Sequence, residues 1–313
     1  MESSGLRVYG GADYPSPRND NGRPTILNRG VCELVNEIRS AKKLGDAGFR
    51  IACTTLVASN DYVVGAMVLG YSLRKIGWDR ETVVQVTPEI SVQNREQLSQ
   101  LWGRVIEIQP IITPHGSQEL GLPAHVRCYT KLRMWELTEY DRLIFIDADA
   151  VVLGSLAELM EGADFAAAPC VTAPDLFNSG VLVITPSQSC FDDMMGQVGR
   201  LPSYDGGDQG FLNSYYPDWY TGDSSRRLPL KFNAPRMLYL YRPSWNRFSY
   251  DMRILHYFGP TKPWNRGATI SSWMLKLLTS SIGDGTSPLR IWKQLFREMQ
   301  KELKANRLVA TLK

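Results

Sequence analysis

Residues 142–149 read RLIFIDAD, a short apolar strand followed by two aspartates on either side of an alanine. Their side chains can point to the same side only because the strand is ending there. Placed together, the carboxylates of Asp147 and Asp149 repel each other unless a cation lies between them. A hard divalent ion such as Mg²⁺ or Mn²⁺ accepts oxygen ligands of this kind. Taken alone, the motif is more typical of a solvated turn than of a metal site, so the surrounding sequence has to decide between them.

The sequence before this motif alternates between strand and helix patterns. We expect strands at 51–57, 82–86 and 105–108, helices from Val64 to Tyr71 and over 92–101, and another helix near 128–137. Such alternation predicts an α/β fold whose mostly parallel central sheet is covered by helices. Ligands of these sheets bind at the carboxyl ends of the strands, which is where the aspartate pair lies.

The two ends of the chain have other patterns. Residues 1–48 are rich in Gly, Pro, Asn and Asp and predict an N-terminal extension. Residues 49–270 form the predicted catalytic domain, with further strands at 165–168 and 181–184 and a helix at 209–215. Residues 271–313 predict a C-terminal helical segment that packs on the domain or on a dimer partner. Its apolar stripe consists of Trp292, Leu295, Phe296, Met299 and Leu303.

Composition excludes several classes of protein. The 313 residues are 43% hydrophobic, enough for one large domain, and the net charge of +3 gives no case for nucleic acid as a partner. The five cysteines are odd in number and widely spread, which indicates reduced thiols. No signal pattern is present, and no apolar run reaches the ~18 residues of a membrane span. We therefore expect a cytoplasmic protein without a membrane partner.

Several short motifs occur along the chain in one order. They are Thr55-Leu56, Tyr62, GAMVLG at 65–70, Thr130-Lys131-Leu132, the aspartate pair, FNSG at 177–180, DGGDQG at 205–210 and HYFGPTKPW at 256–264. Together they resemble glycosyltransferase family 8, and most closely its glycogenin-like subgroup, from about Ala52 to Trp264. The resemblance implies a single GT-A-type, Rossmann-like nucleotide-sugar transferase domain. It also implies transfer of a hexose from a UDP-sugar with retention of the anomeric configuration, using Mn²⁺ or Mg²⁺.

The resemblance assigns a role to each motif. Asp147, Asp149 and His256 would hold the metal, and the glycine of the last motif, Gly259, would let the backbone approach phosphate. Lys262 would place an ammonium group on the leaving diphosphate. Further donor contacts are implied at Leu56, Tyr62, Lys131, Ala148, Asn178, Ser179, Gly180, Asp205, Gly207 and Gly259. Without the resemblance, a lone histidine after an apolar strand is more often structural.

Asp208 is the carboxylate that the resemblance places near the anomeric carbon, and Gln209 beside it is a poorer nucleophile. Asp208 either forms a covalent intermediate by double displacement or stabilises charge in a front-face reaction, and both routes stay open. The chain departs from the family at Val57-Ala58-Ser59, where ribose or uracil contacts are expected, and near Leu122, where the family has an arginine.

Two acceptor hypotheses follow from the resemblance. The favoured one is transfer of galactose or glucose to a hydroxyl of an external glycan or glycoprotein. The alternative is self-glucosylation that primes glycogen, for which Tyr239 after Leu228-Pro229 is the candidate acceptor. Transfer to inositol is a third option. A hypothesis from a different functional class is that the protein is an inactive module that binds a sugar nucleotide. Dimers are common in the family, so a homodimer is expected.

Overall fold

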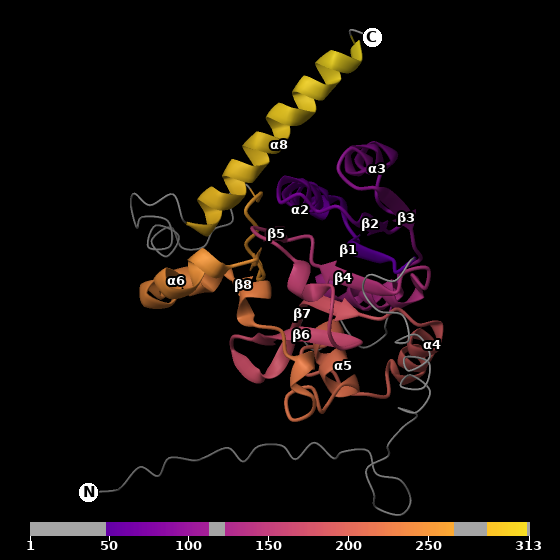
Figure 1. Cartoon of the computed structure of the whole chain (residues 1–313). Coiled ribbons are helices and arrows are strands. Elements are labelled where there is room, and N and C mark those ends of the chain that lie inside the picture. The colour runs from indigo at the N-terminus through magenta and orange to yellow at the C-terminus, as the bar shows by residue number, and fades with distance from the viewer. Residues whose placement is uncertain (1–47, 113–122, 266–286, 312–313) are drawn as a thin grey trace, which may run out of the picture.

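The computed structural model describes residues 48–112, 123–265 and 287–311. The predicted N-terminal extension and the first part of the C-terminal segment lie outside these ranges. A six-stranded sheet of order β3-β2-β1-β4-β7-β6 forms the centre (Figure 1). Its strands are β1 (Ile51–Val57), β2 (Glu81–Val86), β3 (Arg104–Glu107), β4 (Arg142–Ile146), β6 (Phe165–Cys170) and β7 (Ala173–Ile184). The first four run parallel and β7 runs antiparallel to both neighbours, so the predicted mostly parallel α/β sheet is confirmed.

Alternate residues of each central strand point to opposite faces of this sheet, and both faces are buried. One face packs in a core that contains Cys53, Val84, Ile144 and Val183 together with α2 (Val63–Lys75). The other face contributes Ala52, Val83, Leu143, Phe145 and Leu182 to a second core. Burial on both sides explains why these strands are mostly apolar in the sequence and do not alternate between apolar and polar residues.

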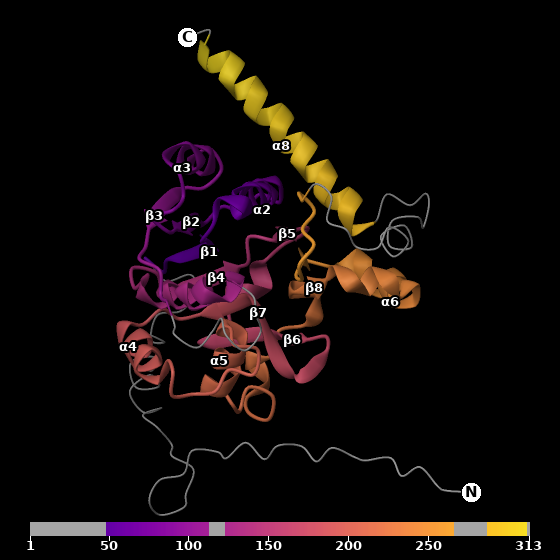
Figure 2. The same cartoon turned by 180° about the vertical axis from the view of Figure 1, so that it is seen from behind.

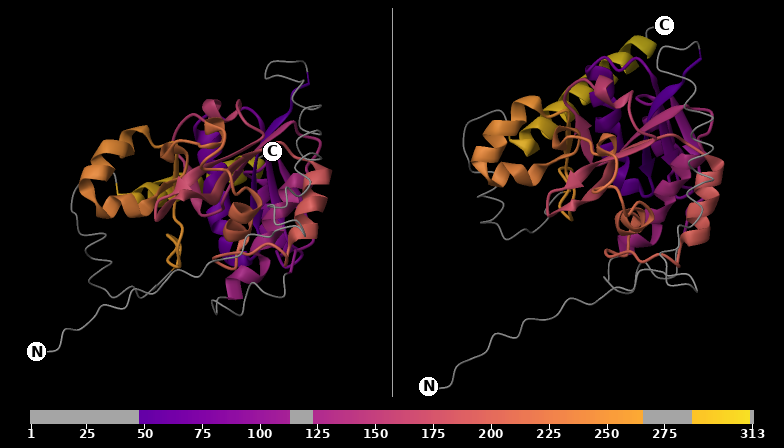
Figure 3. Two further views of the ribbon diagram at one scale, coloured as in Figure 1. Left: turned by 90° about the horizontal axis from the view of Figure 1, so that it is seen from below. Right: turned by 60° about the horizontal axis from the view of Figure 1, so that its bottom comes forward.

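Helices cover the two faces. On one side lie α2 and α3 (Val92–Ser99), and on the other lie α4 (Gln188–Gln197) and α5 (Asp208–Tyr215), as Figures 1 and 2 show from opposite directions. Ser91 and Ser187 cap α3 and α4, because each hydroxyl accepts a hydrogen bond from a backbone N–H of the first turn. The helix α6 (Arg242–Phe248) lies at one side of the molecule, with Trp245 buried in the core of the first face (Figure 3).

A second, three-stranded sheet lies next to the first. It has the order β5-β9-β8 and consists of β5 (Ala150–Val152), β9 (Ile254–His256) and β8 (Ala234–Pro235). β4 of the large sheet leads into β5 of the small one through Asp147–Asp149, so the aspartate motif bridges the two sheets. In the antiparallel β5–β9 pair, Ala150 lies opposite His256. The last residue of β9 is thereby brought beside the motif.

The C-terminal helix α8 (Pro288–Thr311) begins near the small sheet and runs past α2 (Figure 1). Its buried stripe packs in the core of the first face, and Glu298 and Glu302 form ion pairs with Lys75 and Arg74 at the end of α2. The ring of Trp292 lies 5.8 Å from that of Trp264. In the described ranges, no helix is long and apolar enough to cross a membrane.

Two elements differ from the sequence expectation. The helix predicted near 128–137 is a 3₁₀ helix, Pro123–Glu136. Among its buried residues, Tyr129, Leu132 and Trp135 recur at every third position, so a helix with three residues per turn places them on the same side. The strand predicted at 181–184 begins earlier, at Ala173, because FNSG is extended and pairs with β6 instead of forming a turn.

Candidate active site

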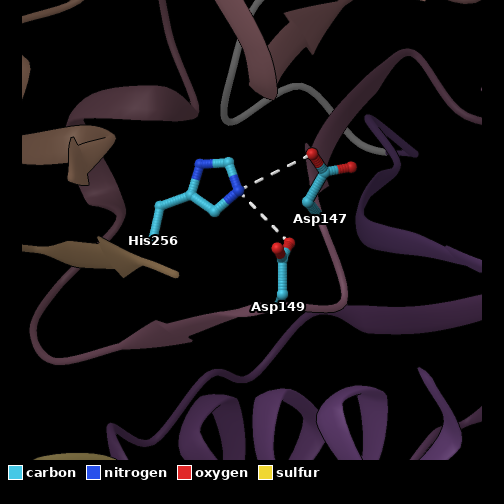
Figure 4. Close-up of side chains that lie close together, drawn as sticks. All are labelled: Asp147, Asp149 and His256. Carbon is cyan, nitrogen blue, oxygen red and sulfur yellow. Dashed lines mark hydrogen bonds and ion pairs between the residues drawn. The ribbon is translucent and has the colours of Figure 1, made fainter. Parts of the chain in front are cut away.

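Three predicted metal ligands converge where the two sheets meet. His256 Nε2 lies 3.2 Å from Asp149 Oδ1 and 3.8 Å from Asp147 Oδ2, so both carboxylates face the same ring nitrogen (Figure 4). Asp147 is tied to the large sheet, because its backbone N–H donates to Gly180 O over 2.8 Å. Asp149 is tied to the small sheet, because its carbonyl accepts from the N–H of Tyr257 over 2.8 Å. Backbone hydrogen bonds thus position the side chains.

A chain of amide groups sets the orientation of the histidine ring. The backbone N–H of Gly180 donates to Asn178 Oδ1 over 3.0 Å, which identifies this atom as the acceptor. Asn233 Nδ2 donates to the same oxygen over 2.7 Å, so Asn233 Oδ1 points the other way, 2.9 Å from His256 Nδ1. The nitrogen Nδ1 therefore donates to Asn233, and Nε2 faces the carboxylates, where its lone pair would be available to a bound cation. Asn233 is 4% exposed, and sequence reasoning missed it.

Lys262 and Tyr62 line one side of the carboxylates. The ammonium group of Lys262 forms an ion pair with Asp149 Oδ2 and lies 5.5 Å from the centre of the Tyr62 ring. Burial would lower the pKa of Lys262, but Asp149 and Tyr62 outweigh it and raise this pKa above its ordinary value. Burial would likewise raise the pKa of Asp149, but His256 and Lys262 hold it well below its usual range.

Lys131 lies between the metal-site carboxylates and Asp208. It is 6% exposed, and its ammonium group lies 3.1 Å from Asp147 Oδ1 and 2.7 Å from Asp208 Oδ2. The hydroxyl of Ser179 donates to the same Asp208 oxygen over 2.7 Å. Burial raises the pKa of Asp147, and Lys131 partly offsets this effect. Three of the predicted residues therefore form one buried network with the first aspartate.

Gln209 is held at both ends of its amide. Its Oε1 accepts from Asn178 Nδ2 over 2.7 Å and from the backbone N–H of Ser179 over 3.3 Å, and its Nε2 donates to the Tyr204 hydroxyl over 2.6 Å. An amide engaged in three hydrogen bonds is suited to orienting its neighbours. Asp205 lies in the preceding turn, and within the described ranges it makes no direct hydrogen bond or ion pair with the three ligand residues. Its Oδ1 accepts from the backbone N–H groups of Gly207 and Gly210, each over 2.9 Å.

Two glycines permit close approach at the site. A β-carbon on Gly180 would lie 2.2 Å from His256 Cε1, closer than any side chain could tolerate. A β-carbon on Gly65 in α2 would lie 2.5 Å from the carbonyl oxygen of Ala148 and 2.6 Å from the ring of Trp264. The glycines at these positions therefore allow the aspartate loop to lie between the helix and β7.

The donor set fits a hard divalent cation. The ligand atoms of Asp147, Asp149 and His256 all lie within 4.8 Å of one another. This span is close to twice the about 2.1 Å at which Mg²⁺ holds oxygen ligands. Two carboxylates and one neutral imidazole also suit Mn²⁺. Lys131 and Lys262 pair with three carboxylates, those of Asp147, Asp149 and Asp208, so these ion pairs leave negative charge that a cation can neutralise.

The remaining predicted residues lie outside the three-residue ligand cluster or contribute only backbone to it. Ala148 is buried within the motif, and Gly259 follows β9 in a left-handed conformation with φ +96°. Leu56, near the end of β1, packs against the second core. Tyr239 is 5% exposed and packs edge-on against Trp245, with ring centres 5.1 Å apart. These positions leave the expected roles of Leu56 and Tyr239 as predictions.

Comparison with known proteins yields consistent matches. The family model described as glycosyl transferase family 8 matches residues 53–168. Glycogenin-1 of Mus musculus is 36% identical over 222 residues, which cover 68% of this chain and 65% of that protein. Inositol phosphorylceramide glucuronosyltransferase 1 of Arabidopsis thaliana is 30% identical over 253 residues, covering 74% and 45%. This chain thus spans less than two thirds of both relatives.

Among solved structures, the galactosyltransferase LgtC in complex with donor and acceptor sugar analogues has a similar fold. The TM-score is 0.55 at 19% sequence identity, and the match covers 79% of this chain and 95% of that one. At this level of identity the similarity concerns the fold alone. It agrees with the single GT-A-type domain expected from the sequence.

Proposed function

We propose, from the premise that the chain belongs to glycosyltransferase family 8, that it is a metal-dependent, retaining UDP-sugar glycosyltransferase. The observation that carries the proposal is the convergence of Asp147, Asp149 and His256 on one point, with Lys262 beside them. Such a set of ligands and cations matches the needs of a nucleoside diphosphate held through a divalent ion.

The chain's own residues would divide the work in this way. Asp147, Asp149 and the Nε2 atom of His256 would hold Mn²⁺ or Mg²⁺, and Lys262 would contact the diphosphate. When bound, the ion supplies positive charge that stabilises the departing diphosphate, an effect worth several kcal/mol. The left-handed backbone at Gly259 leaves room for phosphate oxygens near Lys262.

Asp208 is the residue we propose to act at the anomeric carbon. Lys131 and Ser179 both contact its Oδ2 and fix the orientation of the carboxylate. In this orientation it could serve as the nucleophile of a double displacement or stabilise positive charge in a front-face reaction. Gln209 would act by holding Asn178 in place, since its own amide already makes three hydrogen bonds.

For the acceptor, we propose a hydroxyl of an external glycan or glycoprotein, with galactose or glucose as the transferred sugar. The burial of Tyr239 supports this choice over self-glucosylation, because a 5% exposed ring packed on Trp245 would have to leave its site to react. Tyr241 is 65% exposed and is the more accessible of the two tyrosines. Self-glucosylation at this segment is therefore the second candidate function.

The cell compartment and assembly complete the proposal. We propose a cytoplasmic location, supported by the absence of disulfides among the described cysteines, Cys53, Cys128, Cys170 and Cys190. A homodimer is the proposed assembly, on the family resemblance. An inactive binding module is disfavoured because Asp147 and Asp149 lie beside His256, Lys262 pairs with Asp149, and Lys131 joins Asp208 to Asp147.

A donor screen tests the proposal. Purified protein would be incubated with Mn²⁺ and UDP-glucose, UDP-galactose, UDP-xylose or UDP-N-acetylglucosamine, and UDP release and sugar transfer would be measured. UDP-glucuronate belongs in the screen because the relative from Arabidopsis thaliana is named as a glucuronosyltransferase. One donor should be turned over by the natural protein and not by Asp149→Asn. Binding of UDP without turnover of any donor would favour the inactive module.

A further inference from the structure

The active site contains a cation that the family motifs do not account for. Arg236 directly follows β8, in which Pro235 lies opposite His256 in parallel register. Because the carboxyl ends of parallel neighbours lie together, Arg236 emerges beside the residues that follow His256. Its Nη2 atom lies 3.8 Å from the point where a β-carbon on Gly259 would be. The guanidinium group thus faces the exposed, left-handed glycine.

Arg236 differs from the other cations of the site in having no anionic partner. Lys131 is bound to Asp147 and Asp208, and Lys262 is bound to Asp149. In the part of the chain that the structure describes, the guanidinium of Arg236 makes no hydrogen bond or ion pair. Its side chain is half-buried, and burial lowers its pKa while Asp149 opposes the change. An arginine nevertheless stays protonated at neutral pH.

A half-buried charge without a partner is costly, so this arrangement favours an anionic ligand. We infer that Arg236 binds the diphosphate of the nucleotide-sugar donor, alongside Lys262 and the backbone at Gly259. The inference rests on the proposed function, which supplies the diphosphate. A guanidinium presents its donors as a planar fork that matches two phosphate oxygens, and the missing β-carbon of Gly259 leaves space for them.

The diphosphate is a better match than a carboxylate on the donor sugar. Gly259 lies in the segment that also carries Lys262, and this lysine already faces the metal-site carboxylates. The residues expected on the sugar side, Asn178 and Asp208, are bonded instead to Gln209, Ser179 and Lys131. Their hydrogen-bonding network does not include Arg236.

Binding measurements can test the inference directly. Isothermal titration calorimetry with Mn²⁺ present would compare uridine, UMP, UDP, UDP-glucose and UDP-glucuronate on the natural protein and on Arg236→Gln and Arg236→Lys. A charge-assisted hydrogen bond is worth enough that Arg236→Gln should weaken UDP binding by about tenfold to a hundredfold. Uridine affinity should not change, and UDP, UDP-glucose and UDP-glucuronate should lose the same factor. Arg236→Lys should restore part of the loss.

Arg253→Gln is the matched control. Arg253 precedes β9 at its other end and pairs with Asp251 over 2.8 Å, so its replacement should leave UDP affinity unchanged. Thermal melting of each variant would be recorded, and Arg236→Gln should melt no lower than Arg253→Gln. If Arg236→Gln weakens the binding of uridine as much as that of UDP, or melts far below Arg253→Gln, Arg236 has a structural role and the inference is wrong.

The remaining outcomes distinguish failure of the inference from failure of the proposed function. If the natural protein binds UDP and Arg236→Gln binds it equally well, the inference is wrong and the proposed function stands. A loss confined to UDP-glucuronate would reassign Arg236 to the sugar carboxylate and overturn the diphosphate contact. If the natural protein binds no UDP at all, the inference fails together with the proposed function.

Discussion

Asn233 Oδ1 accepts a hydrogen bond from His256 Nδ1 over 2.9 Å, and this bond leaves the other ring nitrogen facing Asp147 and Asp149. Replacing Asn233 with Ala should release the ring and let it adopt the other tautomer. Such outer partners of metal ligands typically contribute tenfold to a hundredfold in affinity, and we expect a loss of about that size for Mn²⁺. Isothermal titration calorimetry measures it. Asn246→Ala, on the exposed side of α6, is the control and should bind Mn²⁺ normally. Equal affinity in the two variants would contradict the role of Asn233.

Metal removal gives the second prediction. Turnover should stop in a chelator and return when Mn²⁺ is added in excess. UDP should also raise the melting temperature more with Mn²⁺ than without it, because a ligand that binds the folded state more tightly stabilises it more at the same concentration. Asp149→Asn should abolish this difference. Full turnover in the chelator would contradict the assignment of Asp147, Asp149 and His256 as metal ligands. Equal shifts of the melting temperature with and without Mn²⁺ would contradict it as well.

Replacement of Asp208 by Asn separates chemistry from binding. The change keeps the size of the side chain and removes the charge held by Lys131. We expect kcat to fall far more than UDP affinity, because the carboxylate is proposed to act only as the glycosidic bond breaks. Lys262→Ala should instead weaken UDP binding and turnover together, since an ammonium on phosphate acts in both states. If Asp208→Asn lowers only the affinity for the donor and leaves kcat unchanged, Asp208 positions the donor and does not act at the anomeric carbon.

Two glycine replacements compare the site with the surface. In Gly180→Ala the new methyl group would meet His256 Cε1 at 2.2 Å, whereas a β-carbon on Gly196 in α4 would meet nothing within 4 Å outside its own helix. Overpacking of this kind costs about 1–3 kcal/mol, so Gly180→Ala should lower the free energy of unfolding by that amount and weaken Mn²⁺ binding. Gly196→Ala should gain about 0.5–1 kcal/mol from helix propensity. Denaturant unfolding gives both values. Normal stability of Gly180→Ala would show that the ring can move aside.

Intact mass measurement distinguishes the two acceptor hypotheses. With UDP-glucose or UDP-galactose and Mn²⁺, an enzyme with an external acceptor should show little or no series of hexose additions to itself. It should hydrolyse the donor slowly and transfer quickly to a suitable glycoside. A long series that disappears in the Tyr239→Phe, Tyr241→Phe double variant would instead establish self-glucosylation. Burial of Tyr239 leads us to expect the first result.

Sequence patterns predicted the large sheet well, for a physical reason. The strands β1 and β4 begin and end at the predicted residues, because both faces of the sheet are buried and each strand is mostly apolar. The apolar stripe of the C-terminal helix was also visible in the sequence, and in the structure α8 packs on α2. Patterns of this kind depend on neighbours in the sequence.

The small sheet and the hydrogen-bonded network around the site could not be read in the same way. β8 contains two residues and β5 contains three, which is too short for any periodicity. Asn233 looks like an ordinary polar residue before Ala-Pro, and only its contact with a histidine 23 positions away reveals its role. Lys131 likewise resembles a surface lysine in the sequence, although it is buried between two carboxylates.

The bridging position of the aspartate motif has a mechanical consequence. Asp147 is anchored to β7 of the large sheet through Gly180, while Asp149 and His256 are anchored in the small sheet. A cation held by all three would fasten the two sheets to each other. Ion binding should therefore slow amide hydrogen exchange throughout β5, β8 and β9 as one cooperative unit, well beyond the ligands themselves. The more tightly this protein binds the ion, the more strongly the ion would stabilise the packing of the small sheet against the large one.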